Sequence, residues 1–139
     1  MKIVTSLLIA LALTFAGIHS PAFAGDGDPL YVNLTTNESH RASMAISFSK
    51  NQFERGHPLT IFLNDKGVLL GSKANATAFP EHQKLLVELI NKGAVVLICP
   101  MCMKQYGVKE TDVLPGVKIG SPELTGNALF KDGTKTLTW

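Results

Sequence analysis

An uninterrupted apolar run that ends in two cysteines is the feature that most limits how this chain can fold. Residues 94–98 are all apolar, and Cys99 and Cys102 follow, with Pro100 between them. A short run without a polar break is typical of a strand buried on both faces, as in the middle of a parallel sheet. Pro is favoured at the first position of a helix, because its missing N–H would have no partner there. The run therefore predicts a central strand that passes into a helix, with both thiols at the junction.

The rest of the chain alternates short β-type runs with segments of helical spacing. We expect strands at 30–34, 58–63, 117–120 and 134–139, and helices at 39–55, 80–92, 101–106 and after Ser121. Strands that alternate with helices form right-handed crossover units, which predicts a three-layer α/β/α sandwich with a mostly parallel central sheet. Sites in such sheets lie beyond the carboxyl ends of the strands. The segments that leave the strands at Thr35, Asn64, Cys99 and Gly120 are therefore expected at one edge.

The first 24 residues have the pattern of a secretory signal peptide. A basic start at Lys2 precedes a nearly continuous apolar stretch, and Ala22-Phe23-Ala24 forms a small-x-small cleavage site before Gly25. The alternative, a retained membrane anchor, is disfavoured because the apolar stretch is short for a span. We therefore expect residues 25–139 to form one exported domain, periplasmic in a Gram-negative host. No later stretch reaches membrane length, so no membrane association is expected after cleavage.

The charge balance excludes one large class of partners. The chain has 13 Lys and Arg against 11 Asp and Glu, a formal net charge of +2. This balance lacks the basic footprint of a nucleic-acid-binding protein. The glycine-rich phosphate-binding loops are also absent from the sequence. We therefore expect no nucleic-acid partner and no organic cofactor.

The spacing of the two cysteines favours a reactive pair over a structural disulfide. Two cysteines in an exported chain often form a structural disulfide. A bridge between Cys99 and Cys102 would close a very small loop, which adds little stability in the chain-entropy account. A helix N-terminus favours the thiolate form of a nearby cysteine. The pair thus favours redox or sulfur chemistry, with metal binding and a structural bridge as alternatives.

Two rival interpretations involve the same residues. A thioredoxin-like fold also places a C-x-x-C pair after a strand, but this pair follows about two complete βα units, and Ile98 stands where an aromatic residue is expected. The second rival is a non-catalytic oligomeric module that holds Cu(I) through Cys99, Met101 and Cys102, since thiolate and thioether ligands select that ion. Methionines also serve as ordinary packing residues.

Six further residues were considered for roles beside the thiols: His40, His57, Asp65, Lys66, His82 and Tyr106. A crossover helix begins near the carboxyl edge of the sheet, which would bring His82 towards the thiols as a base. Asp65 and Lys66 also fit an ordinary turn. All three histidines, His82 included, are more typical of surface or capping positions, and Tyr106 is more typical of a packing position at a helix end.

The order of these features resembles the DsrE/DsrF-like family of sulfur-handling proteins. The matching motifs are the first strand running into Thr35-Thr36, the strand 59–63 followed by Asn64-Asp65, Lys92-Gly93-Ala94 before a hydrophobic strand, Cys99 upstream of Gly107, and Gly116-Val117 entering a short strand. The resemblance spans most of residues 25–139. It implies an α/β/α sandwich that assembles into trimers or hexamers. Family members that transfer sulfur carry it as a persulfide on one cysteine after the third strand, and Cys99 occupies that position.

Export and a second cysteine distinguish this chain from the sulfur-relay members of the family. A thiolate at Cys102 can attack a persulfide on Cys99, expel sulfide and leave a disulfide. The pair therefore suits reductive release of sulfur, or dithiol–disulfide exchange, better than passive relay. We expect Cys99 to accept sulfur and Cys102 to resolve it, with a small sulfur compound or a partner protein's thiol as the other reactant.

Overall fold

The computed structural model describes residue 25 and residues 27–139, so the expected signal peptide at 1–24 lies outside the described residues. The strands are β1 (Leu30–Leu34), β2 (Leu59–Leu63), β3 (Val95–Ile98), β4 (Lys118–Ile119) and β5 (Lys135–Thr138). They form one sheet in the order β4-β3-β2-β1-β5, and every pairing is parallel. The prediction of a mostly parallel sheet with β3 inside it is therefore confirmed, and β5 lies at an edge as expected.

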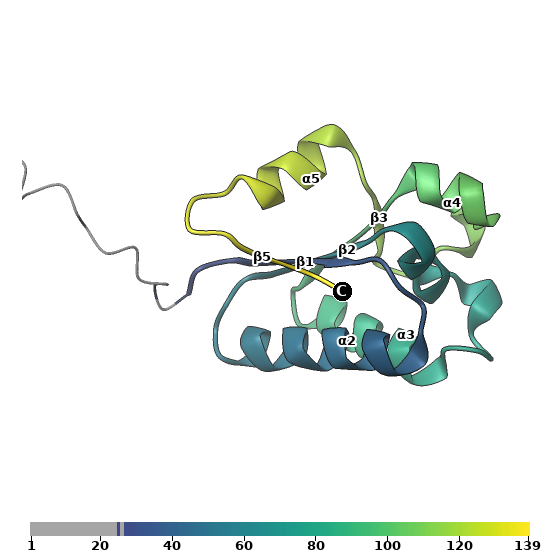
Figure 1. Ribbon diagram of the computed structural model, residues 1–139, viewed down its shortest axis with the longest axis horizontal. Coiled ribbons are helices and arrows are strands. Elements are labelled where there is room, and N and C mark those ends of the chain that lie inside the picture. Colours follow the sequence, from purple (N-terminus) through teal and green to yellow (C-terminus); the bar gives the residue numbers. More distant parts are fainter. Residues whose placement is uncertain (1–24, 26) are drawn as a thin grey trace, which may run out of the picture.

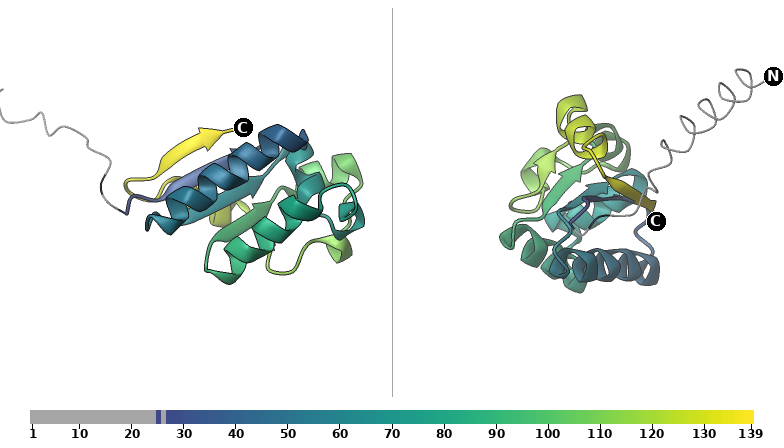
Figure 2. Two further views of the ribbon diagram at one scale, coloured as in Figure 1. Left: turned by 90° about the horizontal axis from the view of Figure 1, so that it is seen from below. Right: turned by 90° about the vertical axis from the view of Figure 1, so that its left-hand side faces the viewer.

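Helices cover both faces of this sheet. The α-helices are α2 (Ser39–Glu54), α3 (Pro80–Asn91), α4 (Pro100–Tyr106) and α5 (Pro122–Leu129), and 3₁₀ turns span Asp65–Gly71, Lys73–Asn75 and Glu110–Asp112. Figure 1 shows α2 and α3 on one side of the sheet and α4 and α5 on the other, and the views in Figure 2 agree. The architecture is the expected three-layer α/β/α sandwich. Within the described part of the chain, no helix combines the length and apolar character needed to cross a bilayer.

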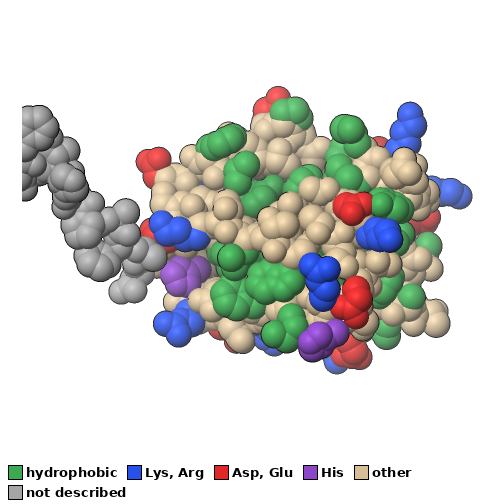
Figure 3. Space-filling view, viewed as in Figure 1, with side chains coloured by type: hydrophobic (Ala, Val, Ile, Leu, Met, Phe, Trp, Pro, Cys, Tyr) green, Lys and Arg blue, Asp and Glu red, His purple; other side chains and the backbone are tan. Residues whose placement is uncertain are grey.

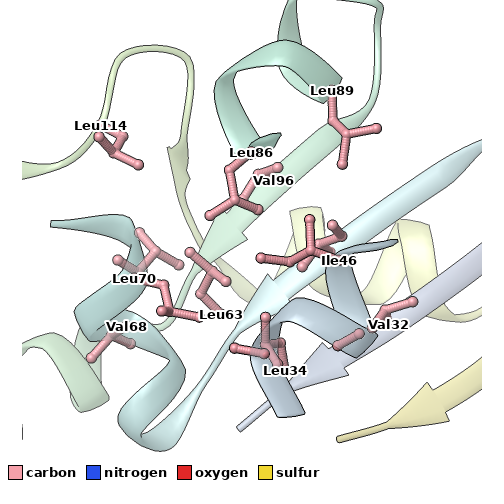
Figure 4. Packing of buried hydrophobic residues seen from close by; sticks show 14 of the residues in the cluster. Val32, Leu34, Ile46, Leu63, Val68, Leu70, Leu86, Leu89, Val96 and Leu114 are labelled. Atoms are coloured by element: carbon pink, nitrogen blue, oxygen red, sulfur yellow. The ribbon is translucent and has the colours of Figure 1, made fainter. Parts of the chain in front are cut away.

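The main hydrophobic core lies between the sheet and the pair α2 and α3. Successive residues of a strand point to opposite faces of the sheet. Val32, Ile61 and Val96 lie on three neighbouring strands and point to the same layer. These three occupy one register across β1, β2 and β3 and are at most 1% exposed. Figure 4 shows Val32 and Val96 in the same cluster as the helix residues Ile46 and Leu86, which are fully buried. Burial of this face orients the strands, and with them the residues at their ends.

Backbone hydrogen bonds continue past the carboxyl ends of the strands. The N–H of Asn64 donates to the carbonyl of Leu34, that of Cys99 to Leu63, and that of Gly120 to Ile98, at 2.8–3.0 Å. Each strand exit is thereby fixed to its neighbour, which brings the expected segments to one edge of the sheet.

The second face and the β5 edge are less thoroughly covered. Phe48 of α2 and Trp139 at the end of the chain pack with ring centroids 5.6 Å apart, and Phe48 is 37% exposed. Figure 3, seen from the same direction as Figure 1, shows hydrophobic side chains gathered in the middle of the surface that faces the viewer. Apolar surface therefore remains accessible beside an edge strand.

Gly67 packs directly against the backbone of Leu34 at the carboxyl edge of the sheet, and a substitution there tests this contact. A Cβ at this position would lie 2.0 Å from the carbonyl oxygen of Leu34, so Gly67→Ala forces the backbone apart. We expect a loss of about 2–4 kcal/mol in the free energy of unfolding, measured by urea denaturation. Gly126→Ala is the matched control, because a Cβ there meets nothing within 4 Å inside α5. The control should be neutral or up to about 1 kcal/mol more stable; equal effects of the two substitutions would contradict the packing described.

Candidate thiol site

The junction of β3 and α4 positions Cys99. Its backbone belongs to the edge ladder, and it is also the N-cap residue of α4, with extended φ and ψ of −73° and 114°. The Cys99 sulfur accepts a hydrogen bond from the backbone N–H of Cys102 at 3.3 Å. Pro100 occupies the first helical turn, as predicted. Cys99 thus takes the place that Ser or Asp usually has at a helix start.

The two cysteine sulfurs face each other across this first turn. The sulfur atoms lie 2.7 Å apart, and the Cys102 thiol donates to Cys99. Both cysteines are free thiols and only partly buried. Because a covalent S–S bond is about 2.05 Å long, a shift of under about 1 Å joins them. The structure therefore brings together the two residues that the sequence indicated, where solvent reaches them.

Asn64 is a neighbour of the thiols that the sequence analysis did not single out. Its Oδ1 accepts from the Cys102 sulfur at 3.4 Å, and its Nδ2 donates to Oδ1 of Asn33 at 3.1 Å. A chain of polar contacts therefore runs from Cys99 through Cys102 and Asn64 to Asn33. The available signal was the position of Asn64, which directly follows β2 at the edge that also carries Cys99.

Asp65 and Tyr106 tie α4 to the turn that follows β2. Asp65 adopts a left-handed backbone conformation with φ of 47°, and its carboxylate accepts a hydrogen bond from the Tyr106 hydroxyl. That hydrogen bond is the main reason that the pKa of Tyr106 is raised, with burial and the Asp65 charge adding to it. Tyr106 is thus a polar anchor of α4 as well as a packing residue.

The environment of Cys102 keeps it protonated. Burial raises the pKa of Cys102 most, and the neighbouring Cys99 side chain raises it further. The backbone N–H of Asp65 acts in the opposite direction, and its carboxylate charge raises the pKa slightly. Cys102 is therefore the thiol that donates a proton in this pair, and Cys99 Sγ is the acceptor.

The other residues considered from the sequence do not join the thiols in one cluster. His82 is buried, and its Nε2 contacts the Ser43 hydroxyl at 3.0 Å and the Ser39 carbonyl at 2.9 Å, so it connects α3 to α2. His57 contacts the Asp28 carbonyl at 2.8 Å beside the start of β2, at the opposite edge of the sheet. His40 and Lys66 are exposed. The expectation that His82 serves the thiols as a base finds no supporting contact.

Met101 lies in the first turn of α4 but projects into solvent. Its side chain is 81% exposed, in contrast to Met103, which is 3% exposed and belongs to the core. A Cu(I) site with Cys99, Met101 and Cys102 as ligands would require Met101 to turn back towards the sulfurs. Of the three ligands that this copper site would need, only the two cysteine sulfurs already lie close together.

The fold and the site define a class of parallel α/β proteins that carry two neighbouring thiols at the carboxyl edge of the sheet. The model of the DsrE/DsrF-like family matches residues 30–138. The chain therefore belongs to the DsrE/DsrF-like family.

Individual proteins are similar to this chain in sequence or in fold. The chain is 35% identical over 82 residues to the uncharacterized protein MJ0989 of Methanocaldococcus jannaschii, which covers 58% of this chain and 72% of that protein. Among solved structures, the protein of unknown function MTH1491 from Methanobacterium thermoautotrophicum is similar with a TM-score of 0.67 and 16% identity, over 80% of this chain and 98% of that one. The ychN protein from E. coli is similar with a TM-score of 0.60 and 18% identity, over 81% and 99%. The two solved structures support the fold.

The raised pKa of Cys102 predicts how its reactivity depends on pH. In the Cys99→Ser variant Cys102 is the one remaining thiol, and burial still acts on it. Only the thiolate is alkylated, so a raised pKa shifts the rise in rate to higher pH. We expect the iodoacetamide profile of the folded variant to lie at higher pH than that of the same variant in denaturant. Coincident profiles, or a shift to lower pH, would contradict the described environment.

Proposed function

We propose that this protein handles sulfur or exchanges thiols and disulfides at the Cys99–Cys102 pair. The observation that carries the proposal is the 2.7 Å approach of two free, partly exposed thiols at the junction of β3 and α4. Membership of the DsrE/DsrF-like family supports the same class of chemistry. Cys99 is the sulfur-accepting residue, and Cys102 is the resolving thiol.

The sulfur transfer follows from thiol–disulfide exchange. The Cys99 thiolate attacks the outer sulfur of a donor persulfide, R–S–SH, forms a new S–S bond and releases the carrier as R–SH. The Cys102 sulfur then attacks Cys99 Sγ, which breaks that bond and releases the transferred sulfur as H₂S. The two thiol protons leave with R–SH and H₂S, and the protein is left with a Cys99–Cys102 disulfide. One donor molecule is reduced by two electrons for each dithiol oxidised.

The polar neighbours of Cys102 support this division of roles. The single S–H of Cys102 has two acceptors in reach, Cys99 Sγ at 2.7 Å and Asn64 Oδ1 at 3.4 Å, so Cys102 is held close to the sulfur that it must attack. Burial is the main cause that raises the pKa of Cys102, which disfavours its thiolate form and supports giving Cys102 the second step. Cys102 gives up its proton as its sulfur attacks Cys99 Sγ, and the departing sulfide carries that proton away as H₂S.

A substrate that carries a disulfide instead of a persulfide reacts through the same two steps. A mixed disulfide forms on Cys99 first, and attack by Cys102 then releases the second half of the substrate. Sulfur release and dithiol–disulfide exchange therefore require the same two residues in the same order.

The proposal also includes export and self-association. The leader pattern at 1–24 supports export, periplasmic in a Gram-negative host. The exposed β5 edge and the partly exposed Phe48 support a homo-oligomer, a trimer or hexamer by resemblance to the family. Expression of the full chain in a Gram-negative host should yield periplasmic protein that begins at Gly25. Protein that stays in the cytoplasm with residues 1–24 intact would contradict export.

Intact mass after exposure to a polysulfide tests the chemistry. The wild-type protein should lose about 2 Da as the disulfide forms. Cys102→Ser should instead retain a gain of about 32 Da on Cys99, because nothing resolves the persulfide. Cys99→Ser is the matched control and should show neither change.

Two results would contradict the proposal. The first is an adduct that persists in Cys99→Ser at the wild-type level. The second is stoichiometric retention of Cu(I) by the wild-type protein with no sulfur adduct, which would favour the copper-binding module with Cys99, Met101 and Cys102.

A further inference from the structure

The side chain of Asn64 does not cap the turn that it begins. Asn64 is the N-cap residue of the 3₁₀ turn Asp65–Gly71, and an Asn side chain at a helix start usually accepts from a backbone N–H two or three residues further on. Here the side chain makes no such bond. The backbone of Asn64 is fixed on both sides, because its N–H donates to the Leu34 carbonyl at 3.0 Å and its carbonyl accepts from Gly67 at 2.9 Å. The side chain contacts the Cys102 sulfur instead.

The Asn64 amide has an acceptor and a donor, and it uses one on each side. Oδ1 accepts from Cys102 at 3.4 Å, and Nδ2 donates to Oδ1 of Asn33 at 3.1 Å. Within the described part of the chain, the Asn33 side chain makes this one hydrogen bond. Both amides line a cleft of about 330 Å³, which gives them room to turn. The terminal torsion of Asn is broad and two-fold. A half-turn of both amides therefore presents Nδ2 of Asn64 to the sulfur and keeps the two amides paired.

The second step of the reaction reverses what the Cys102 sulfur needs from its neighbours. The thiol donates a hydrogen bond, whereas the thiolate that attacks accepts hydrogen bonds. The backbone N–H of Asp65 is one donor to this sulfur, and it lowers the pKa of Cys102 against the larger effect of burial. A second donor would favour the thiolate further. The Asn64 oxygen, left in its place, would instead face the negative charge.

We propose that Asn64 is a reversible amide switch at the resolving thiol, an inference that rests on the proposed function. Before the reaction Oδ1 accepts the S–H of Cys102, and during resolution the amide turns so that Nδ2 donates to the attacking sulfur. The amide takes up no proton. The Cys102–Cys99 bond forms, the bond from Cys99 to the leaving sulfur breaks, and the Cys102 proton departs with the leaving group. Asn64 touches the reacting sulfur and is a catalytic residue, while Asn33 acts through it and is a positioning residue.

A chromogenic aromatic disulfide, dithiobis(nitrobenzoate), separates the two steps in one protein sample. Cys99 attacks it and releases one coloured thiolate, and Cys102 then attacks Cys99 Sγ and releases the second. The reagent is reduced by two electrons, the protein gains one disulfide, and the two thiol protons pass to the buffer. The second phase is intramolecular, so its rate does not depend on reagent concentration. The first phase reports folding and access in the same sample.

Asn64→Asp keeps an acceptor of the same shape but offers no N–H. We expect it to slow the second phase about tenfold at pH 7 while the first phase stays within about twofold. The rise of the second phase with pH should move to higher pH, because the thiolate loses a donor and gains a like charge. Asn64→Leu removes the amide without adding charge and should slow the second phase about fivefold. The ionisable groups that act on Cys102 are Cys99, Asp65 and Tyr106, and these variants keep all three.

Asn33→Asp tests the switch from the side away from the sulfur. A carboxylate there only accepts, so it holds Nδ2 of Asn64 and leaves Oδ1 on Cys102. We expect the second phase to slow about fivefold and its pH profile to move to higher pH. Thr138→Asp is the matched control, because Thr138 pairs with Asn33 in the sheet and lines the same cleft. It adds the same charge without contacting the Asn64 amide and should keep both wild-type rates.

The outcomes separate this inference from the proposed function. A wild-type second phase in Asn64→Asp would overturn the switch while the thiol chemistry stands, because an amide that only holds the Cys102 thiol is replaced by a carboxylate without loss. Equal slowing of both phases would overturn it as well, and so would a Thr138→Asp variant as slow as Asn33→Asp. If the wild-type protein released one coloured thiolate and formed no disulfide, the proposed function would fall and the switch with it.

Discussion

Backbone hydrogen bonding between parallel strands determines where the chemistry of this protein lies. The ladder continues one residue beyond each strand, with Cys99 N–H bonded to the Leu63 carbonyl and Asn64 N–H to that of Leu34. Parallel strands end at the same edge, so residues far apart in the sequence become neighbours there. Asn33, Asn64 and Cys99 meet for this reason. The buried face against α2 and α3 keeps the strands in this register, since a slip by one residue would turn the apolar side chains to the wrong layer.

The first turn of α4 gives the two cysteines different surroundings. Cys99 is the N-cap and accepts hydrogen bonds from both the backbone and the thiol of Cys102. Cys102 is held as a donor, and burial raises its pKa. Tyr106 and Asp65 fasten the far end of α4 to the turn after β2, which limits movement of the pair. This asymmetry supports the proposed order of attack, with Cys99 first and Cys102 second.

The sequence predicted the layers and the dithiol because the signals for both are local. The apolar run before Cys99 and the proline after it specify a buried strand and a helix start over a few residues, and the structure confirms both. The partners of the thiols depend on contacts between distant segments. Asn64 was placed at the right edge but not recognised as a neighbour of Cys102, because a side-chain hydrogen bond leaves no pattern in the sequence.

The direction of the His82 side chain also depends on contacts between distant segments. Its helix begins at the expected edge, but its ring turns towards Ser39 and Ser43 of α2, where packing of the two helices determines its direction. A cleft of about 330 Å³ beside Asn64, lined also by Tyr31 and Phe62, was not predicted either. It results from the alternation of polar and aromatic residues on the thinly covered face, together with the path that α5 takes across the sheet.

The central claim is that Cys99 and Cys102 form a reversible redox pair, and the reduction potential tests it most directly. The protein would be equilibrated in glutathione buffers of graded potential, and the state of the pair would be read by acid trapping, alkylation and intact mass. The account predicts one two-electron transition within the range of redox-active pairs, about −120 to −270 mV. Failure of a Cys99–Cys102 disulfide to form under oxidising conditions would contradict it, as would a potential below about −300 mV, which is typical of structural disulfides.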